Sequence, residues 1–328
     1  MRRQLITLAA FALTPGFWLL ASAAPQLPTF EDFRRVDRMR RLTGQLQTAE
    51  LLSVAQIDAS LIKRTARQHA ADATILWGAA ELLPDWSSKR ELFEQTLRVG
   101  GTNAAVALRF ACAAAEARKF DVTQSWLRYC QQKDADNAVP WLVGLWVQRQ
   151  EKKPLELSKP MGTWTTHFRD YSVEASRARI SLLEAVGYSA YAARRLGFSA
   201  DSAALTMVRE MGKPPLDDAA LPILKLTAQA MQDNQPFLLD ELVGQSLERT
   251  LLANRQDADT SPQVRLRVME MDERRDAIKQ LLADMERNTV DLATEPQMVK
   301  YFDDMLAVGE EPAMNRLAEA VRRKASNQ

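Results

Sequence analysis

Apolar side chains recur three and four residues apart along almost the whole chain, and alternating apolar-polar runs are scarce. This spacing gathers apolar side chains on one face of an α-helix. The segments that carry the pattern are short, and turn residues such as Gly100-Gly101 separate them. Because helices joined by short loops become antiparallel neighbours, the pattern predicts an all-α protein built from stacked helical hairpins.

We expect helices over residues 30–42, 49–71, 72–83, 88–99, 103–119, 122–133, 139–150, 166–186, 189–196, 200–211, 217–232, 236–254, 261–287, 295–308 and 311–324. Ser189 and Ser261 stand where a serine oxygen can accept a hydrogen bond from the first turn. Pro262 is tolerated in that turn. The helix at 311–324 is expected to be a polar cap, because terminal repeats need a solvated outer face.

Two helix starts, Asn103-Ala104 and Asn137-Ala138, lie 34 residues apart after polar turns. The segment 133–141, K-D-A-D-N-A-V-P-W, puts an acidic-Asn turn before a helix with an early Trp. Large and small residues alternate in matching places at Phe110, Ala111, Thr123, Leu127 and Cys130. Residues 73–150 therefore resemble the tetratricopeptide-repeat family, whose period is about 34 residues. The departures from its pattern are Ala107, Ala135, Pro140 and Gly144-Leu145.

The resemblance implies an α-solenoid in the first half, in which each hairpin buries its apolar face against the next. The register is lost after residue 150, and the charged, proline-containing stretch 151–165 is the expected boundary. We therefore divide the chain into a signal peptide (1–23), a tetratricopeptide-like helical region (24–150), a linker (151–165) and an irregular C-terminal helical region (166–328).

The first residues are typical of a secretory signal: Arg2 and Arg3, an apolar stretch to Leu20, and Ala21-Ser22-Ala23 as a cleavage site. We expect export to the periplasm or the extracellular space. An uncleaved anchor or a buried first helix is the alternative. Export permits a disulfide between Cys112 and Cys130, and two small packing residues remain the other interpretation.

Charge and motifs exclude several functions. The formal charge of +1 lacks the basic excess of a nucleic-acid binder. With two histidines and no phosphate-binding or metalloprotease motif, we predict no cofactor, no metal and no catalytic residue. Adjacent acids such as Glu31-Asp32 and Asp217-Asp218 suit helix starts. The arginines of 34–41 alternate with apolar residues, which favours packing on a hairpin over contact with a membrane surface.

In the family that the chain resembles, the first helix of each hairpin lines a groove that binds peptides or partner segments. The resemblance implies that this groove contains Trp77, Glu81, Leu108, Leu142, Trp146 and Arg149, with Cys112 beside them. Aromatic and Arg side chains are common anchors at interfaces. The alternative is that the second half of the chain folds back and covers these residues as ordinary core. The exposure of Trp77 and Trp146 distinguishes an open groove from a covered core.

We therefore expect a non-enzymatic, exported interaction or scaffold protein that binds a protein or peptide in the cell envelope. This function predicts a broad open groove without a perturbed pair of acids. The alternative is an exported helical enzyme, such as a carbohydrate-active hydrolase that uses paired carboxylates. It predicts a deep pocket with two facing acids.

Overall fold

The computed structural model describes residues 27–43, 57–156, 167–199, 202–214, 216–233, 236–254, 261–290 and 292–326. These residues form fifteen helices, and their only strand-like pairing is an isolated bridge between Asn137 and His167. The predicted all-α, helical-hairpin class is confirmed. The expected signal peptide (1–23), residues 49–56 of the second expected helix and residues 157–165 of the expected linker lie outside the described residues.

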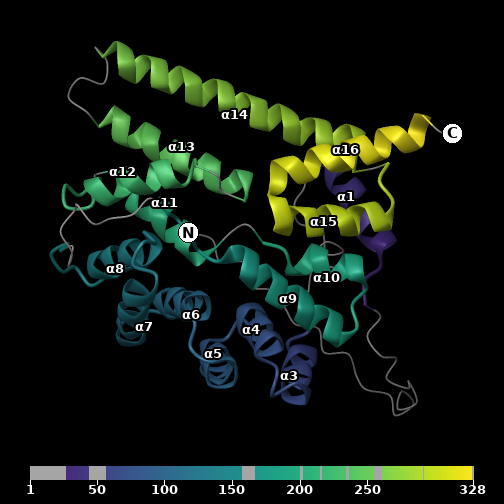
Figure 1. The fold of residues 1–328 in the computed structure, drawn as a ribbon, viewed down its shortest axis with the longest axis horizontal. Helices are drawn as coiled ribbons and strands as arrows, with labels where there is room; N and C mark the ends of the chain where they lie inside the picture. The colour runs from purple at the N-terminus through teal and green to yellow at the C-terminus, as the bar shows by residue number, and fades with distance from the viewer. Residues whose placement is uncertain are drawn as a thin grey trace, which may run out of the picture.

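The first half is a row of helices in which each packs against the next (Figure 1), namely α3 (Ala59–Gln68), α4 (Ala73–Leu82), α5 (Trp86–Gly100), α6 (Ala104–Glu116), α7 (Phe120–Lys133) and α8 (Val139–Gln150). Side-chain oxygens cap the first four of these helices, at Asp58, Asp72, Asp85 and Asn103. Each oxygen accepts a hydrogen bond from an N–H group of the first turn that has no helical partner.

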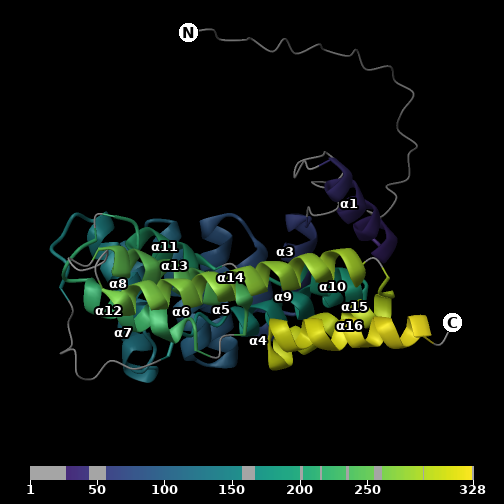
Figure 2. The ribbon, with the colours of Figure 1, turned by 90° about the horizontal axis from the view of Figure 1, so that it is seen from above.

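The second half contributes α9 (Ser172–Val186), α10 (Ala190–Gly197), α11 (Ala203–Met211), α12 (Leu221–Ala230), α13 (Leu238–Ala253), α14 (Pro262–Asn288), α15 (Glu295–Val308) and α16 (Glu310–Ser326). Neighbouring helices pair as hairpins, α9 with α10, α12 with α13 and α15 with α16. Helix α14 runs along one side of the molecule, from α13 to α16 (Figures 1 and 2). The expected caps Ser189 and Ser261 are confirmed, since each accepts a hydrogen bond from its first turn.

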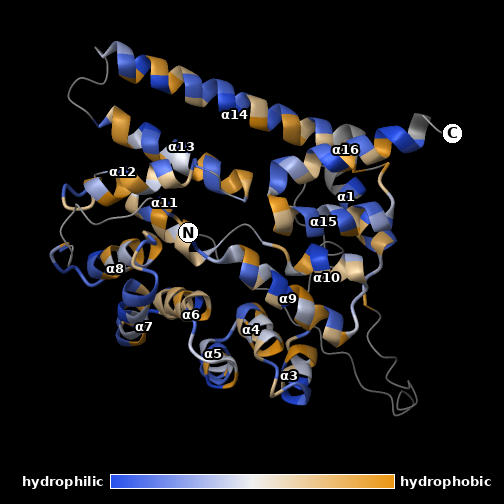
Figure 3. Cartoon of the chain, in the orientation of Figure 1, coloured by the Kyte–Doolittle hydropathy of each residue, from blue (hydrophilic) through white to orange (hydrophobic). Residues whose placement is uncertain are grey.

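The long helix α14 is mostly hydrophilic (Figure 3), and ion pairs attach it to its neighbours. Arg267 Nε donates to Glu248 Oε1 of α13 over 2.8 Å. Arg274 donates to Glu241 Oε1 of α13 and to Glu311 Oε2 of α16, both over 2.7 Å. These contacts join α13 and α16 through α14.

The two halves share their cores. Helix α9 packs along α4, and Leu182 of α9 belongs to the same buried cluster as Leu76 and Phe110 of the first half. A second cluster joins apolar residues of α6, α7 and α8 to those of α11, α12 and α13. Burial of apolar surface is the main favourable term in folding, so residues before and after the segment 151–165 stabilise one another.

The first helix, α1 (Phe30–Thr43), packs its apolar side on the second half. The rings of Phe30 and Phe33 lie 4.7 and 5.7 Å from that of Tyr191 in α10. Asp37 pairs with Arg195 over 3.2 Å. The expected docking on a neighbouring element therefore involves α10 rather than the next hairpin along the chain. None of the helices described combines the length and the apolar character needed to cross a bilayer.

Candidate functional site

Residues 167–171, which lead into α9, are not helical, whereas the sequence predicted a helix from residue 166. Ala138 N donates to His167 O (2.9 Å), and Arg169 N donates to Asn137 Oδ1 (3.0 Å). Asn137 Nδ2 returns a hydrogen bond to Arg169 O (2.7 Å). Asn137 is buried, so the acidic-Asn turn fixes the backbone of 167–169 and delays the helix until Ser172.

Asp170 and Tyr171 complete this connection. Tyr171 has a left-handed backbone (φ 57°), and its hydroxyl donates to Asp134 Oδ2 over 2.7 Å. Asp170 Oδ1 accepts hydrogen bonds from the backbone N (3.0 Å) and the hydroxyl (2.7 Å) of Ser172, at the start of α9. Asp170 is 6% exposed, and its other oxygen, Oδ2, is buried with no hydrogen-bond partner among the described residues.

A second buried carboxyl group comes from the first turn of α13. Asp240 is 2% exposed, and its Oδ1 has no hydrogen-bond partner in the described part of the chain. Glu310 is already hydrogen-bonded to the start of α13, because its Oε2 accepts from Leu238 N over 2.9 Å. Burial, with the nearby charges of Asp170 and Glu310, raises the pKa of Asp240 to about 8, against the opposing effect of the Arg209 charge.

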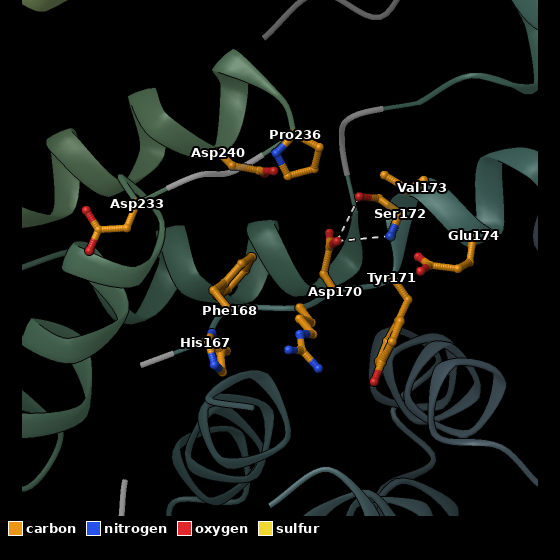
Figure 4. Close-up of a pocket in the computed structure, with 11 residues that line it drawn as sticks. His167, Phe168, Asp170, Tyr171, Ser172, Val173, Glu174, Asp233, Pro236 and Asp240 are labelled. Atoms are coloured by element: carbon orange, nitrogen blue, oxygen red, sulfur yellow. Dashed lines mark hydrogen bonds between the residues drawn. The ribbon is translucent and has the colours of Figure 1, made fainter. Parts of the chain in front are cut away.

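Both carboxyl groups line one pocket of about 530 Å³, which residues 167–174, Asp233, Pro236 and Asp240 enclose. Figure 4 shows Asp170 reaching up from the segment before α9 and Asp240 extending from α13 toward the same space. We call this space the carboxylate pocket and define it by its four acids, Asp170, Glu174, Asp233 and Asp240.

The carboxylate pocket is suited to a positive charge or to proton transfer. Its basic lining residues are His167 and Arg169, both exposed, and Arg169 lies 3.8 Å from Asp134. Four acids therefore line this pocket, and its one lining arginine lies near a carboxylate outside it. Among the described residues, no group of three or more His, Cys, Asp or Glu side chains is arranged to hold a metal ion.

The resemblance assigns six residues to a groove, and three of them are buried in the structure. Leu108 and Leu142 are each 1% exposed and Trp146 is 7% exposed. They belong to the cluster that α11, α12 and α13 complete. At these three positions the second half of the chain covers the expected groove, which is the covered-core alternative.

The other three residues are polar or half-buried. Trp77 is half-buried, and its Nε1 donates to Glu81 Oε1 over 3.2 Å. Arg149 is exposed, and its Nη1 donates to Glu210 O over 3.2 Å. Trp146 reaches the carboxylate of the same Glu210. The structure thus brings Trp77 to Glu81, and Trp146 to Arg149.

Glu81 forms a buried ion pair with Arg109, which the sequence analysis did not single out. Arg109 Nε and Nη2 donate to the two Glu81 oxygens over 2.9 and 2.6 Å. Burial alone would raise the pKa of Glu81, but the Arg109 guanidinium outweighs it and lowers that pKa to about 2. Cys112 lies on the same helix, and both it and Cys130 are buried, free thiols.

Sequence reasoning missed the two central carboxyl groups. Asp170-Tyr171-Ser172 contains a local signal, since an Asp often accepts from the backbone two residues later. Asp240 follows the start of α13 and reads as an ordinary first-turn acid. Their approach depends on how elements 70 residues apart in the chain pack.

Comparisons with known proteins find no relative of this chain. No protein-family model matches it, and neither a curated protein nor a solved structure does. What the protein does therefore has to be inferred from its own residues.

Proposed function

We propose that this is a non-enzymatic binding protein of the cell envelope, whose carboxylate pocket receives a lysine or arginine side chain of a protein or peptide partner. One observation carries the proposal. Asp170 and Asp240, from separate elements, line the same pocket, and each has one buried carboxylate oxygen without a hydrogen-bond partner among the described residues. A buried polar group is costly unless it is hydrogen-bonded, and a cationic donor would meet that requirement.

The chemistry of the pocket favours a cation over a neutral group. An ammonium or guanidinium group carries only donors, which match carboxylate oxygens that accept. Glu174 and Asp233 add negative charge at the same pocket, and acidic clefts concentrate cations from solution. Because the partner stabilises ionised Asp240, its binding should lower the pKa of that carboxyl from about 8.

The partner class and the location belong to the same proposal. The tetratricopeptide resemblance of residues 73–150 supports a protein or peptide as the source of the cation. The basic start, the apolar stretch and Ala21-Ser22-Ala23 support export. N-terminal sequencing of the chain purified from its own cells tests the location, since export predicts a start at Ala24. An intact Met1 in the envelope fraction would contradict cleavage.

Calorimetric titration with acetyl-arginine amide tests the pocket, with acetyl-citrulline amide as the uncharged probe. We expect binding of the arginine probe alone, tightening as the pH rises through about 8 because Asp240 must ionise. Asp240→Asn should remove this pH dependence, and Asp170→Asn should weaken binding. The matched control is Asp121→Asn, an exposed acid in the first turn of α7. Equal binding of both probes, or equal loss in the control, would overturn the proposal.

A second function has one specific observation in its favour. The pKa of Asp240, about 8, keeps a carboxyl group protonated near neutral pH beside Asp170. A protonated acid and a neighbouring carboxyl are the groups that a glycoside hydrolase uses. A pocket with two acids, one of them with a raised pKa, is what the enzymatic alternative predicts, whereas the open groove expected of a binding protein is covered at Leu108, Leu142 and Trp146.

Turnover distinguishes the two functions. A hydrolase would release nitrophenol from some member of a panel of nitrophenyl glycosides. The pH-rate profile would be bell-shaped, with an upper limb near 8, and Asp240→Asn would remove the activity. Binding of the arginine probe without turnover of any glycoside supports the binding protein.

A further inference from the structure

A second pocket, of about 280 Å³, is lined by residues of α4, α5 and α6 in the first half and by residues of α9 and the start of α11 in the second half. Its lining differs from that of the carboxylate pocket, and it contains two arginines, Arg109 and Arg179. We call it the arginine pocket. Both arginines are buried, and a buried charge is costly unless it is paired and hydrogen-bonded.

The Arg109 guanidinium is only partly hydrogen-bonded among the described residues. Its Nε and Nη2 are taken by Glu81, as described above. Its Nη1 is buried and has no hydrogen-bond partner among the described residues. The side chain is 9% exposed and lines the pocket. A guanidinium has five N–H donors in a fixed plane, so the described residues leave part of the hydrogen-bonding capacity of Arg109 unused.

Arg179 is held by neutral groups. Its Nε donates to Gly197 O over 2.8 Å and its Nη2 to Ser176 Oγ over 2.9 Å. Burial lowers the pKa of Arg179 to about 10, with Arg109 acting in the same direction and the carboxylates of Glu81 and Asp170 against it. Within the described residues, no carboxylate comes within ion-pair distance of Arg179, so its charge is incompletely balanced.

The start of α11 and Lys89 add positive potential. Ser202, Ala203 and Thr206 line the pocket at the first turn of α11. The Ser202 hydroxyl caps this turn by accepting from Leu205 N, and the dipole of the helix adds positive potential at the same end. Lys89 of α5 lines it as well. The opposing charges are Glu81, which is engaged by Arg109, and Glu116.

We propose that the arginine pocket binds a phosphate group, either as inorganic phosphate or as part of a small phosphate ester. A phosphate is a tetrahedral anion whose oxygens accept from several directions, and here donors come from α5, α6, α9 and the start of α11. Guanidinium groups and helix N-termini are common phosphate ligands. The volume of about 280 Å³ is large enough for a phosphate group.

The test is a set of titrations of the full chain at constant ionic strength, followed by calorimetry and by the thermal unfolding midpoint. The probes are inorganic phosphate, free phosphoserine and acetate. We expect phosphate to bind and to raise the unfolding midpoint, with little effect of acetate. Tighter binding of phosphoserine than of inorganic phosphate would identify an ester as the ligand, and the reverse order would identify free phosphate.

Two variants of α5 make the test specific. Lys89→Gln removes a cation that lines the pocket, and Arg98→Gln removes an exposed cation from the last turn of the same helix. We expect Lys89→Gln to weaken phosphate binding about tenfold, because it removes one hydrogen bond to a charged group. Arg98→Gln should leave phosphate binding unchanged. Asp240→Asn should leave phosphate binding intact, which separates this site from the carboxylate pocket. Absent binding, equal effects of acetate and phosphate, or equal losses in the two α5 variants would overturn the proposal.

Discussion

The indole Nε1 of Trp146 donates a 2.6 Å hydrogen bond to the Glu210 carboxylate, and this contact joins α8 to the end of α11. Arg149, one turn later, donates to the backbone oxygen of the same glutamate. Leu142 lies one turn earlier and is fully covered. Helix α11 therefore packs on the face of α8 that, by the repeat resemblance, would line a groove.

Removal of this hydrogen bond should destabilise the fold. Trp146→Phe keeps an aromatic ring but leaves Glu210 without its indole donor, and a hydrogen bond to a charged group contributes about 1.5–3 kcal/mol. We expect a loss of that size in the free energy of unfolding, measured by urea denaturation. Trp86→Phe is the control, because Trp86 packs near Phe110 and has no indole hydrogen bond among the described contacts. Similar losses in the two variants would show that ring size, not the hydrogen bond, matters.

Gly78 marks the closest approach of α4 and α9. A Cβ atom added there would collide with the backbone carbonyl of Ala178 and lie 2.7 Å from its carbon. Gly78→Ala should therefore destabilise the protein, by about 1–3 kcal/mol for an overpacked core, although alanine favours the helix. Urea denaturation measures the change. A more stable variant would mean that α9 does not lie where the structure has it.

Gly144 provides the matched comparison. It lies inside α8, and the nearest atom to an added Cβ, Leu127 Cδ1, is 3.9 Å away. Gly144→Ala meets no obstacle, so helix propensity should raise the free energy of unfolding by about 0.5–1 kcal/mol. Opposite signs for the two Gly→Ala changes are the expected result of the same denaturation series.

The Glu81–Arg109 ion pair should show strong coupling. Glu81→Leu or Arg109→Leu alone strands a buried charge, which costs about 3–5 kcal/mol. The double substitution removes both charges, so its cost should fall well below the sum of the single costs. A double-mutant cycle by denaturation measures the coupling. Additive losses would mean that the two side chains do not interact.

The helices could be predicted from the sequence because their cause is local. The three-and-four spacing locates nearly all of them, and caps such as Ser189 and Ser261 set their starts. The start of α9 could not be predicted, because Asn137 is hydrogen-bonded to Arg169, and Ala138 N to His167 O, across about 30 positions of the chain. That competition for backbone groups is invisible to helix periodicity.

The covering of the expected groove and the two pockets depend on contacts between distant elements. The clearest sign in the sequence that the second half packs on the first is Gly78, since a glycine inside a helix often marks the close approach of another backbone. No pattern in the sequence links Asp170 to Asp240. Arg109 looks like a single charged residue on an otherwise apolar helix, so its burial could not be predicted. Which charges end up buried together is set by how α4, α6, α9 and α13 pack, not by spacing along the chain.

The pKa of Asp240 makes stability depend on pH in a defined direction. The value rises from 3.8 to about 8 on folding. Between these values the native state holds a proton that the unfolded state has released, so this group lowers the free energy of unfolding as the pH rises.

Asp240→Asn abolishes this dependence. Relative to the unmodified protein, the variant should gain stability between about pH 4 and pH 8, by up to about 1.4 kcal/mol per pH unit. Urea denaturation across this range measures the difference, with Asp121→Asn as the exposed first-turn control. A difference that stays flat with pH would show that Asp240 is ionised in the native state. A pocket with an ionised Asp240 would still attract a cation, but the cation's affinity would lose its rise toward pH 8, and the carboxyl group could not act as an acid.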